Sequence, residues 1–206
     1  TQVIYPKEAG YLLMYLDIAP GATVVECGSG SGGFTTVLAH FVGPQGRVVS
    51  YDRRPEFQEI ARNNVARWGV EDRVTFKERD IEEGFDETEA SAVFLDVPTP
   101  WDYLEQAKRA LRPGGRLGIL VPTFNQIQQS IEALREGSWV DIEALEIFLR
   151  HLKTNPARLR PEDTMVGHTG YLIFASSVSP EAAQALPWED RPGEAPAEAP
   201  LLPHTA

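Results

Sequence analysis

The sequence predicts an α/β fold built on a doubly wound, mostly parallel β-sheet. Short apolar runs alternate with amphipathic stretches through five successive units, which is the pattern of parallel strands joined by helices. A glycine-rich segment lies directly between the first apolar run and the next amphipathic stretch. Two further strand-like stretches follow each other at the end with no helix between them, which predicts an antiparallel hairpin that closes the sheet.

The first half of the chain supplies three of these strands. Pro6 suits the first turn of a helix, where its missing N–H would be unpaired in any case, so we expect a helix from Pro6 to Ile18. Gly69 marks the end of another helix, because glycine readily adopts the left-handed conformation found there. The predicted order is strand 22–26, glycine segment 27–33, helix 34–42, strand 46–52, helix 54–69 and strand 72–80.

The second half continues the alternation and then leaves it. Pro113 and the glycines after it end a helix that begins at Pro100. The predicted order is strand 91–96, helix 100–115, strand 116–122, helix 124–137, and then strands 139–150 and 169–178 joined by a polar loop. The sheet is therefore expected to have seven strands.

Length and composition fit one folded domain. The chain has 206 residues and is 42% hydrophobic, enough for a sizeable core. We expect that domain to span residues 1–178. The stretch 179–206 is rich in Pro, Ala and Glu, and it is expected to be a disordered tail.

The chain shows no targeting or membrane signal. No apolar run approaches the length needed to cross a bilayer, and the first residues do not form a signal peptide. Cys27 is the single cysteine, which excludes an internal disulfide framework and favours a reducing compartment. A cytoplasmic protein is expected, with no membrane partner and no metal.

The charge excludes a generic nucleic-acid binder. The formal net charge is −11, whereas neutralising a phosphate backbone needs Lys and Arg. Any contact with a nucleic acid must therefore use a local basic patch, another subunit or a further domain.

The glycine segment predicts a ligand-binding loop. Glycines let the backbone turn sharply and approach a ligand next to the positive end of a helix. Two patterns fit equally well. Gly28, Gly30 and Gly33 match the dinucleotide fingerprint, whereas Gly28, Gly30 and Gly32 after Glu26 match the E-x-G-x-G-x-G loop of enzymes that use S-adenosylmethionine.

Carboxylates at the strand ends favour S-adenosylmethionine. Glu26 is unsuited to a neighbouring pyrophosphate but suits the cationic amino-acid end of S-adenosylmethionine. Asp52 can hold both ribose hydroxyls, and Asp80 can accept from an adenine amino group. The alternative for Asp52 and Asp80 is that each caps the helix after it.

The segment after the fourth strand is stiff and acidic. Asp96 ends an apolar run, and Val97, Pro98, Thr99, Pro100 and Trp101 follow it. Amine-directed methyltransferases often carry an acid, two prolines and an aromatic residue here, although the spacing differs. Prolines pre-organise the loop, which suits holding an amine-bearing base in line with a methyl donor. The alternatives are that Asp96 caps a helix and that Trp101 is packing core.

Five segments together resemble one family. They occur in order over residues 1–172: "TQVIYPKEAG", "ECGSGSGG", "FLDVPTPW", "VPTFNQIQQ" and "VGHTGYL". They are similar to the tRNA (adenine-N1)-methyltransferases, which make 1-methyladenosine at position 58 of the T loop. The resemblance implies a class I, Rossmann-like S-adenosylmethionine-dependent methyltransferase with tRNA as partner, usually a homotetramer. Family members also carry a small N-terminal β domain, which we expect this chain to lack.

The resemblance also implies roles for individual residues. Asp96 is the expected catalytic residue, in contact with both cofactor and target base. The expected cofactor-binding residues are Gln2, Glu26, Gly28, Ser29, Gly30, Ser31, Gly32, Gly33, Asp52, Asp80, Ile81 and Asp96. The expected substrate-binding residues are Tyr5, Pro98, Trp101, Pro122, Gln126 and His168. A plain turn before the last strand accounts for His168 equally well.

Other functions stay open at this level. The glycine segment also allows an NAD-dependent dehydrogenase, although Glu26 and the terminal hairpin argue against it. A non-catalytic tRNA-binding subunit typically loses the glycine loop and the catalytic acid, and both are present here. A class I methyltransferase that acts on a small molecule or a protein is the remaining alternative.

Overall fold

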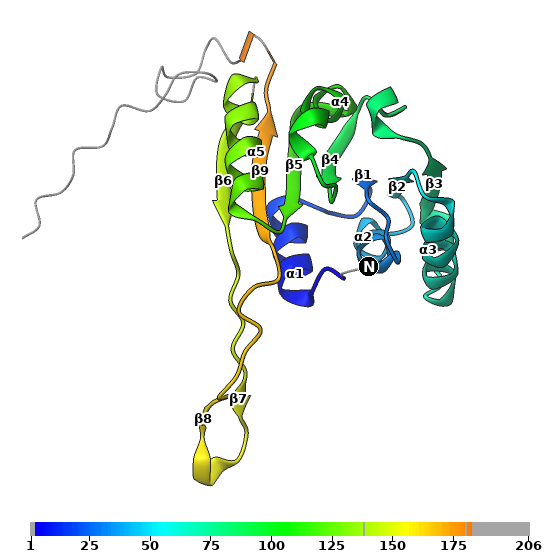
Figure 1. Cartoon of the computed structure of the whole chain (residues 1–206). Coiled ribbons are helices and arrows are strands. Elements are labelled where there is room, and N and C mark those ends of the chain that lie inside the picture. The colour runs from blue at the N-terminus through cyan, green and yellow to red at the C-terminus, as the bar shows by residue number, and fades with distance from the viewer. Residues whose placement is uncertain (1–2, 138, 180, 183–206) are drawn as a thin grey trace, which may run out of the picture.

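The computed structural model describes residues 3–137, 139–179 and 181–182, so Gln2 and most of the stretch 179–206 lie outside the described residues. A seven-stranded sheet forms the centre of the molecule, in the order β3-β2-β1-β4-β5-β9-β6 (Figure 1). The strands are β1 (Thr23–Cys27), β2 (Arg47–Asp52), β3 (Val74–Glu78), β4 (Ala90–Leu95), β5 (Leu111–Val121), β6 (Trp139–Leu145) and β9 (Tyr171–Ser177). The first five are parallel, as the alternation predicts.

The predicted antiparallel pair is confirmed, and its position explains how the sheet closes. β9 runs antiparallel to β5, and β6 runs antiparallel to β9. β9 is therefore inserted between β5 and β6. As a consequence, the start of β9 lies at the same edge of the sheet as the carboxyl ends of the parallel strands.

Helices cover both faces of the sheet (Figure 1). They are α1 (Pro6–Tyr15), α2 (Gly33–Val42), α3 (Pro55–Arg67), α4 (Leu104–Ala110) and α5 (Phe124–Glu136). Val24 and Val48 pack with α1, α2 and α3, whereas their neighbours Val25 and Val49 pack with α4 and α5. Successive residues of a strand point to opposite faces, so a strand with adjacent apolar residues supplies two cores at once.

The predicted helix over 100–115 is shorter in the structure. A 3₁₀ turn, η3 (Pro100–Tyr103), leads into α4, and the chain is already extended at Leu111. Pro113 cannot continue a helix, and Gly114 has a positive φ of 74°. β5 therefore begins five residues earlier than the sequence predicts, at 111 rather than 116.

The predicted polar loop between the last two strands is a structured arm. Residues 146–170 leave the sheet, form the two-stranded ladder of β7 (Leu152–Lys153) and β8 (Arg160–Pro161), and return (Figure 1). The short helices η1 (Glu71–Arg73), η2 (Ile81–Glu83) and η4 (Pro156–Arg158) complete the described elements. None of the described helices is both long and apolar enough to span a membrane.

Candidate active site

A cavity of about 670 Å³ opens at the carboxyl ends of the parallel strands. This edge is where open α/β sheets bind ligands. Ten of the residues singled out in the sequence line it: Tyr5, Gly28, Gly30, Asp52, Asp80, Ile81, Asp96, Pro98, Pro122 and Gln126. The fold thus brings together residues from both the cofactor set and the substrate set.

The glycine loop lies against the end of β4. The N–H of Gly28 donates to the carbonyl of Tyr51 at 2.9 Å, and the N–H of Asp96 donates to the carbonyl of Cys27 at 2.9 Å. Gly28 has a φ of +97°, and a Cβ placed there would collide with the backbone carbonyl of Asp96. Glycine is therefore required here both by the backbone conformation and by the close approach of two strand ends.

Asp52 forms the polar wall of the cavity at the end of β2. Its carboxylate is buried and accepts from the N–H of Gly30 at 3.4 Å. Arg54 donates to the same carboxylate through its backbone N–H at 3.0 Å and its Nε at 3.1 Å. Asp52 is thus held by a cation and by the glycine loop.

Glu26 lies beneath the glycine loop rather than in the cavity lining. It is 1% exposed, and its Oε2 accepts from Thr35 at 2.5 Å and from Ser50 at 2.6 Å. Ser29 is also buried and shares a 2.7 Å hydrogen bond with Ser50. Burial raises the pKa of Glu26 to about 7, although the two hydroxyl donors oppose this shift.

Asp96 lies partly buried in the cavity wall, at the end of β4, the strand between β1 and β5. Burial raises its pKa to about 6, with Arg54 opposing the shift and Asp52 adding to it. The loop after Asp96 is fixed from α5, because the amide of Gln126 donates to the carbonyl of Pro98 at 2.9 Å. An acid with a raised pKa in a cavity is typical of a functional site.

Asp80 and Ile81 line the far end of the cavity, after β3. Asp80 caps η2, accepting from the N–H of Glu82 at 3.1 Å, and it also lies 3.6 Å from Arg53. The helix-cap role considered from the sequence is therefore real for Asp80, and it leaves the side chain at the cavity wall.

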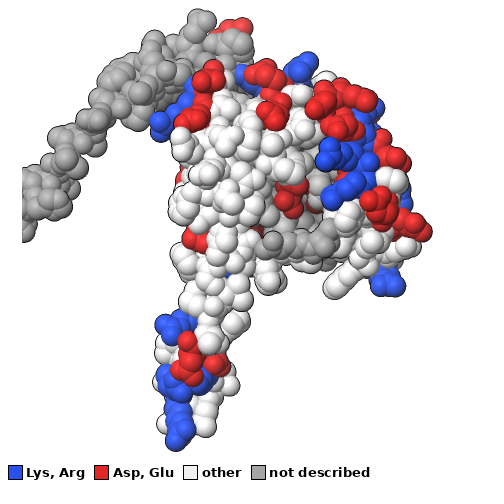
Figure 2. All heavy atoms as spheres, in the orientation of Figure 1, with Lys and Arg blue, Asp and Glu red and all other residues white. Residues whose placement is uncertain are grey.

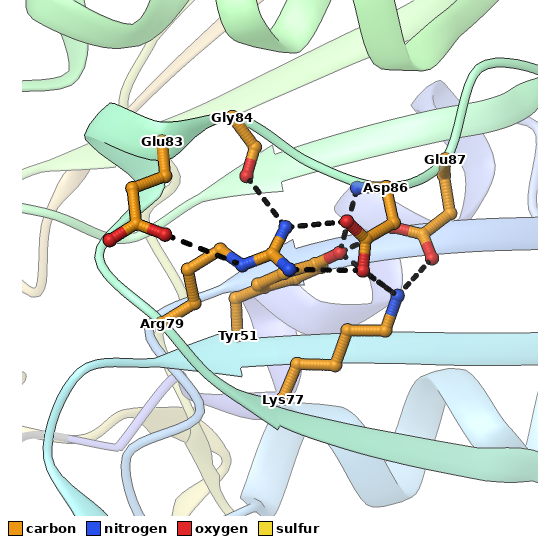
Figure 3. Close-up of polar contacts among 7 residues, drawn as sticks. All are labelled: Tyr51, Lys77, Arg79, Glu83, Gly84, Asp86 and Glu87. Atoms are coloured by element: carbon orange, nitrogen blue, oxygen red, sulfur yellow. Dashed lines mark hydrogen bonds and ion pairs between the residues drawn. The ribbon is translucent and has the colours of Figure 1, made fainter.

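A polar cluster holds the segment after Asp80 against the sheet (Figure 3). The Tyr51 hydroxyl donates to Glu87 at 2.7 Å, and it accepts from Lys77 at 3.2 Å and from the Asp86 N–H at 3.0 Å. Arg79 and Lys77 both pair with Asp86, and these cations lower the pKa of Asp86 to about 2. The loop is therefore anchored at several points, and Arg79 reaches the cavity.

The other predicted residues that the structure describes are not among those that line the cavity. His168 shares hydrogen bonds with Glu146 at 2.7 Å and with the carbonyl of Pro122 at 2.9 Å, so it braces the start of β9. Trp101 is partly buried in η3. Ser31, Gly32 and Gly33 form the turn into α2, where a Cβ on Gly32 would strike Ala61.

Sequence reasoning missed several residues of the cavity. Arg53, Arg54 and Arg79 line it near Asp52 and Asp80, and Glu8 lines it beside Thr169, a residue that the family resemblance does place close to the pocket. The arginines follow strand ends directly, which is a signal that could have found them. Nothing in the sequence places Glu8 beside Thr169, because they are 161 positions apart.

Comparisons with known proteins agree on one family. Residues 1–164 match the family described as tRNA methyltransferase complex GCD14 subunit. The tRNA (adenine(57)-N(1)/adenine(58)-N(1))-methyltransferase TrmI of Methanocaldococcus jannaschii is 34% identical over 204 residues, covering 86% of this chain and 72% of that protein.

Solved structures share the fold. The tRNA (m1A58) methyltransferase TrmI of Aquifex aeolicus has a TM-score of 0.82 at 36% identity, covering 87% of this chain and 71% of that one. A SAM-dependent O-methyltransferase of Thermotoga maritima has a TM-score of 0.86 at 45% identity, covering 87% and 68%. The glycine loop, the strand-end acids and these matches lead to one conclusion: the chain belongs to the tRNA methyltransferase family of GCD14 subunits.

Proposed function

We propose that this protein transfers a methyl group from S-adenosylmethionine to N1 of adenosine 58 in the T loop of tRNA. The observation that carries the proposal is the position of Asp96. It lines one cavity together with Gly28 and Gly30 of the glycine loop and with Tyr5, Pro122 and Gln126 of the expected substrate set. An acid in that position can face both a methyl donor and a base.

The cavity suits S-adenosylmethionine. Gly30 lines it with open space where a side chain would be, which lets a ligand approach the backbone, and buried Asp52 offers acceptor oxygens of the kind that bind a ribose diol. Asp80 and Ile81 would contact the adenine, and Glu26 would act from beneath the loop. When bound, the cofactor supplies an electrophilic methyl group on a sulfonium.

Asp96 would act by electrostatics. Adenine N1 has a free lone pair, and the base becomes cationic when N1 is methylated. A carboxylate beside the N6 amino group would orient the base and stabilise the growing positive charge. Pro98 is held by Gln126, so the rim that receives the base is pre-organised. The adenine must leave the folded T loop to reach this cavity.

One exposed arginine offers the local positive charge that an acidic chain needs to bind RNA. Arg53 lines the cavity, and its side chain is 68% exposed. Arg54 and Arg79 also line the cavity, but they are paired with Asp52 and Asp86. A guanidinium can pair with phosphate oxygens through two N–H groups, so we infer that Arg53 contacts a phosphate next to the target nucleotide.

The arm supports a homo-oligomer, with a tetramer as the state implied by the family. It exposes Phe148, Leu149, Leu152, Leu159 and Val166, while Lys and Arg gather toward its tip (Figure 2). A ladder of only two strands is marginally stable in water, and a cluster of exposed apolar side chains favours a contact with another protein. We propose that the arm packs against a second copy.

A second candidate function is O-methyl transfer, because one relative at 45% identity is described as an O-methyltransferase. The experiment that separates the two is methyl transfer to an unmodified tRNA transcript, followed by mass spectrometry of the modified nucleotide. We expect 1-methyladenosine at position 58, and the same map reports on position 57. A transcript that stays unmethylated, or a methyl group on ribose oxygen, would overturn the proposal.

A further inference from the structure

Glu8 is a buried acid in the wall of the cavity that the mechanism above does not use. It lies in the first turn of α1, its exposed fraction is 2%, and it lines the same cavity as Asp96. A buried carboxylate must be paired or hydrogen-bonded to be tolerated. The partners of the Glu8 carboxylate therefore indicate its role.

Only one of its two oxygens is paired within the described part of the chain. Oε1 accepts from the ammonium of Lys7 and from the hydroxyl of Thr169. Lys7 is held in turn by Thr169 at 2.7 Å and by the carbonyl of Ile147 at 2.6 Å. Oε2 is buried and has no hydrogen-bond partner among the described residues. A buried acceptor without a donor is unfavourable unless a ligand or a bound water supplies the donor, and this one belongs to a residue that lines the cavity.

The order of the strands indicates which part of the cavity Glu8 lines. Asp52 and the glycine loop lie at the ends of β2 and β1, whereas Thr169 precedes β9, on the opposite side of β4. Asp96 ends β4, between them. β9 is two strands away from β4, which corresponds to roughly 10 Å. Thr169 and Glu8 therefore lie well beyond the proposed cofactor end, toward the place for the methyl acceptor.

We propose that Glu8 is a specificity-determining residue, whose Oε2 accepts a hydrogen bond from the exocyclic amino group of the target adenine. This inference rests on the proposed function. The amino group carries two hydrogens. Asp96 would accept the one on the N1 side, and Glu8 would accept the other, so that two carboxylates hold the base from both sides and favour an amine over an oxo group.

Glu8→Gln tests this sharply because Lys7 fixes the orientation of the new amide. The ammonium can only donate, so the amide oxygen must stay on its side and the NH₂ must take the place of Oε2. The variant therefore replaces an acceptor by a donor at one point in the cavity. Glu143→Gln is the control, since Glu143 bonds Tyr15 and lies outside the cavity lining.

The experiment measures binding of a T-arm stem–loop RNA to protein saturated with S-adenosylhomocysteine. One RNA carries adenine at position 58 and the other carries purine, which lacks the amino group. We expect wild type and Glu143→Gln to prefer adenine by about tenfold or more, and Glu8→Gln to lose most of this preference. Glu8→Asp keeps the charge and should retain part of the preference for adenine. This variant replaces Glu8→Gln in the test if Glu8→Gln does not fold.

Two results would overturn the inference. One is an unchanged adenine preference in Glu8→Gln. The other is weaker binding of S-adenosylhomocysteine with the preference intact, which would assign Glu8 to the cofactor. Failure of the proposed function is distinguishable from both, because wild-type protein would then leave adenosine 58 unmethylated in the tRNA assay.

Discussion

The backbone N–H of Asp96 donates a 2.9 Å hydrogen bond to the carbonyl of Cys27, the residue before the first glycine of the loop. The proposed catalytic acid and the proposed cofactor loop are therefore joined through the backbone, at the point where β1 and β4 end side by side. A change that separates them is expected to affect cofactor binding and catalysis together.

Gly28→Ala separates them directly. The new Cβ would meet the Asp96 carbonyl in a backbone with a φ of +97°, so we expect a loss of about 3 kcal/mol in unfolding free energy and a large loss of S-adenosylmethionine affinity. Gly21→Ala is the matched control, because Gly21 also has a positive φ but no atom within 4 Å of the added Cβ. It should lose only about 1 kcal/mol. Equal effects in denaturant titrations would contradict the steric account.

Glu26 predicts a pH dependence of stability. Its pKa rises from 4.5 to about 7 on folding, so between these values the folded chain holds a proton that the unfolded chain has lost. Its contribution to the unfolding free energy is therefore full below pH 4.5 and is lost as the pH rises through about 7. Glu26→Gln should flatten the stability profile over this window, as measured by urea titration at several pH values. A profile that keeps its slope would show that another group is responsible.

Asp96 predicts the acid limb of the activity profile. The carboxylate is the form that can accept from an amino group, and its pKa of about 6 lies well above the ordinary 3.8. We expect kcat/KM to fall about tenfold per pH unit below pH 6. Arg54 favours the ionised form, so Arg54→Met should move this limb to higher pH. A limb that stays near pH 4 would rule out a buried Asp96 as the titrating group.

Tyr51 links stability to the cofactor end of the cavity. Tyr51→Phe removes the hydroxyl that bonds Glu87, Lys77 and the Asp86 N–H, so we expect a loss of about 1–2 kcal/mol and a severalfold higher Kd for S-adenosylmethionine. Tyr15→Phe is the control, because its hydroxyl bonds Glu143 away from the cavity. Calorimetric titration of both variants decides the point: equal affinities would mean that the cluster does not position the loop.

The arm predicts the effect of charge on assembly. Leu152 and Leu159 are 61% and 69% exposed, so replacing both with Glu should lower the molar mass measured by light scattering if they contact a second copy. Trp68→Glu is the control, since Trp68 is 76% exposed but follows α3. An unchanged molar mass in the arm variant would show that the arm does not contact a second copy.

Much of the fold could be predicted because each local signal agreed with the global one. The apolar runs form buried strands, Gly69 follows the end of α3, and the glycine segment leads into the start of α2. The insertion of β9 between β5 and β6 could not be predicted, because strand order depends on packing between distant segments. The arm was missed for a related reason: its ladder pairs only two residues on each side, too few to show a period.

The candidate site shows the same division. Asp52, Asp80 and Asp96 were found because strand ends of a parallel sheet meet at one edge. The burial of Glu26 beneath the loop depends on Ser50 and Thr35 from other elements, which no spacing reveals. Glu8 was missed because its significance comes from its contact with Thr169.

The most direct test of the central claim is Asp96→Ala, assayed for methyl transfer to tRNA and for S-adenosylmethionine affinity on the same preparation. Asp102→Ala, at an exposed acid in η3, is the control. We predict that Asp96→Ala abolishes transfer to adenosine 58 and leaves cofactor affinity within a modest factor, while Asp102→Ala keeps both. Full turnover by Asp96→Ala on tRNA would contradict the account.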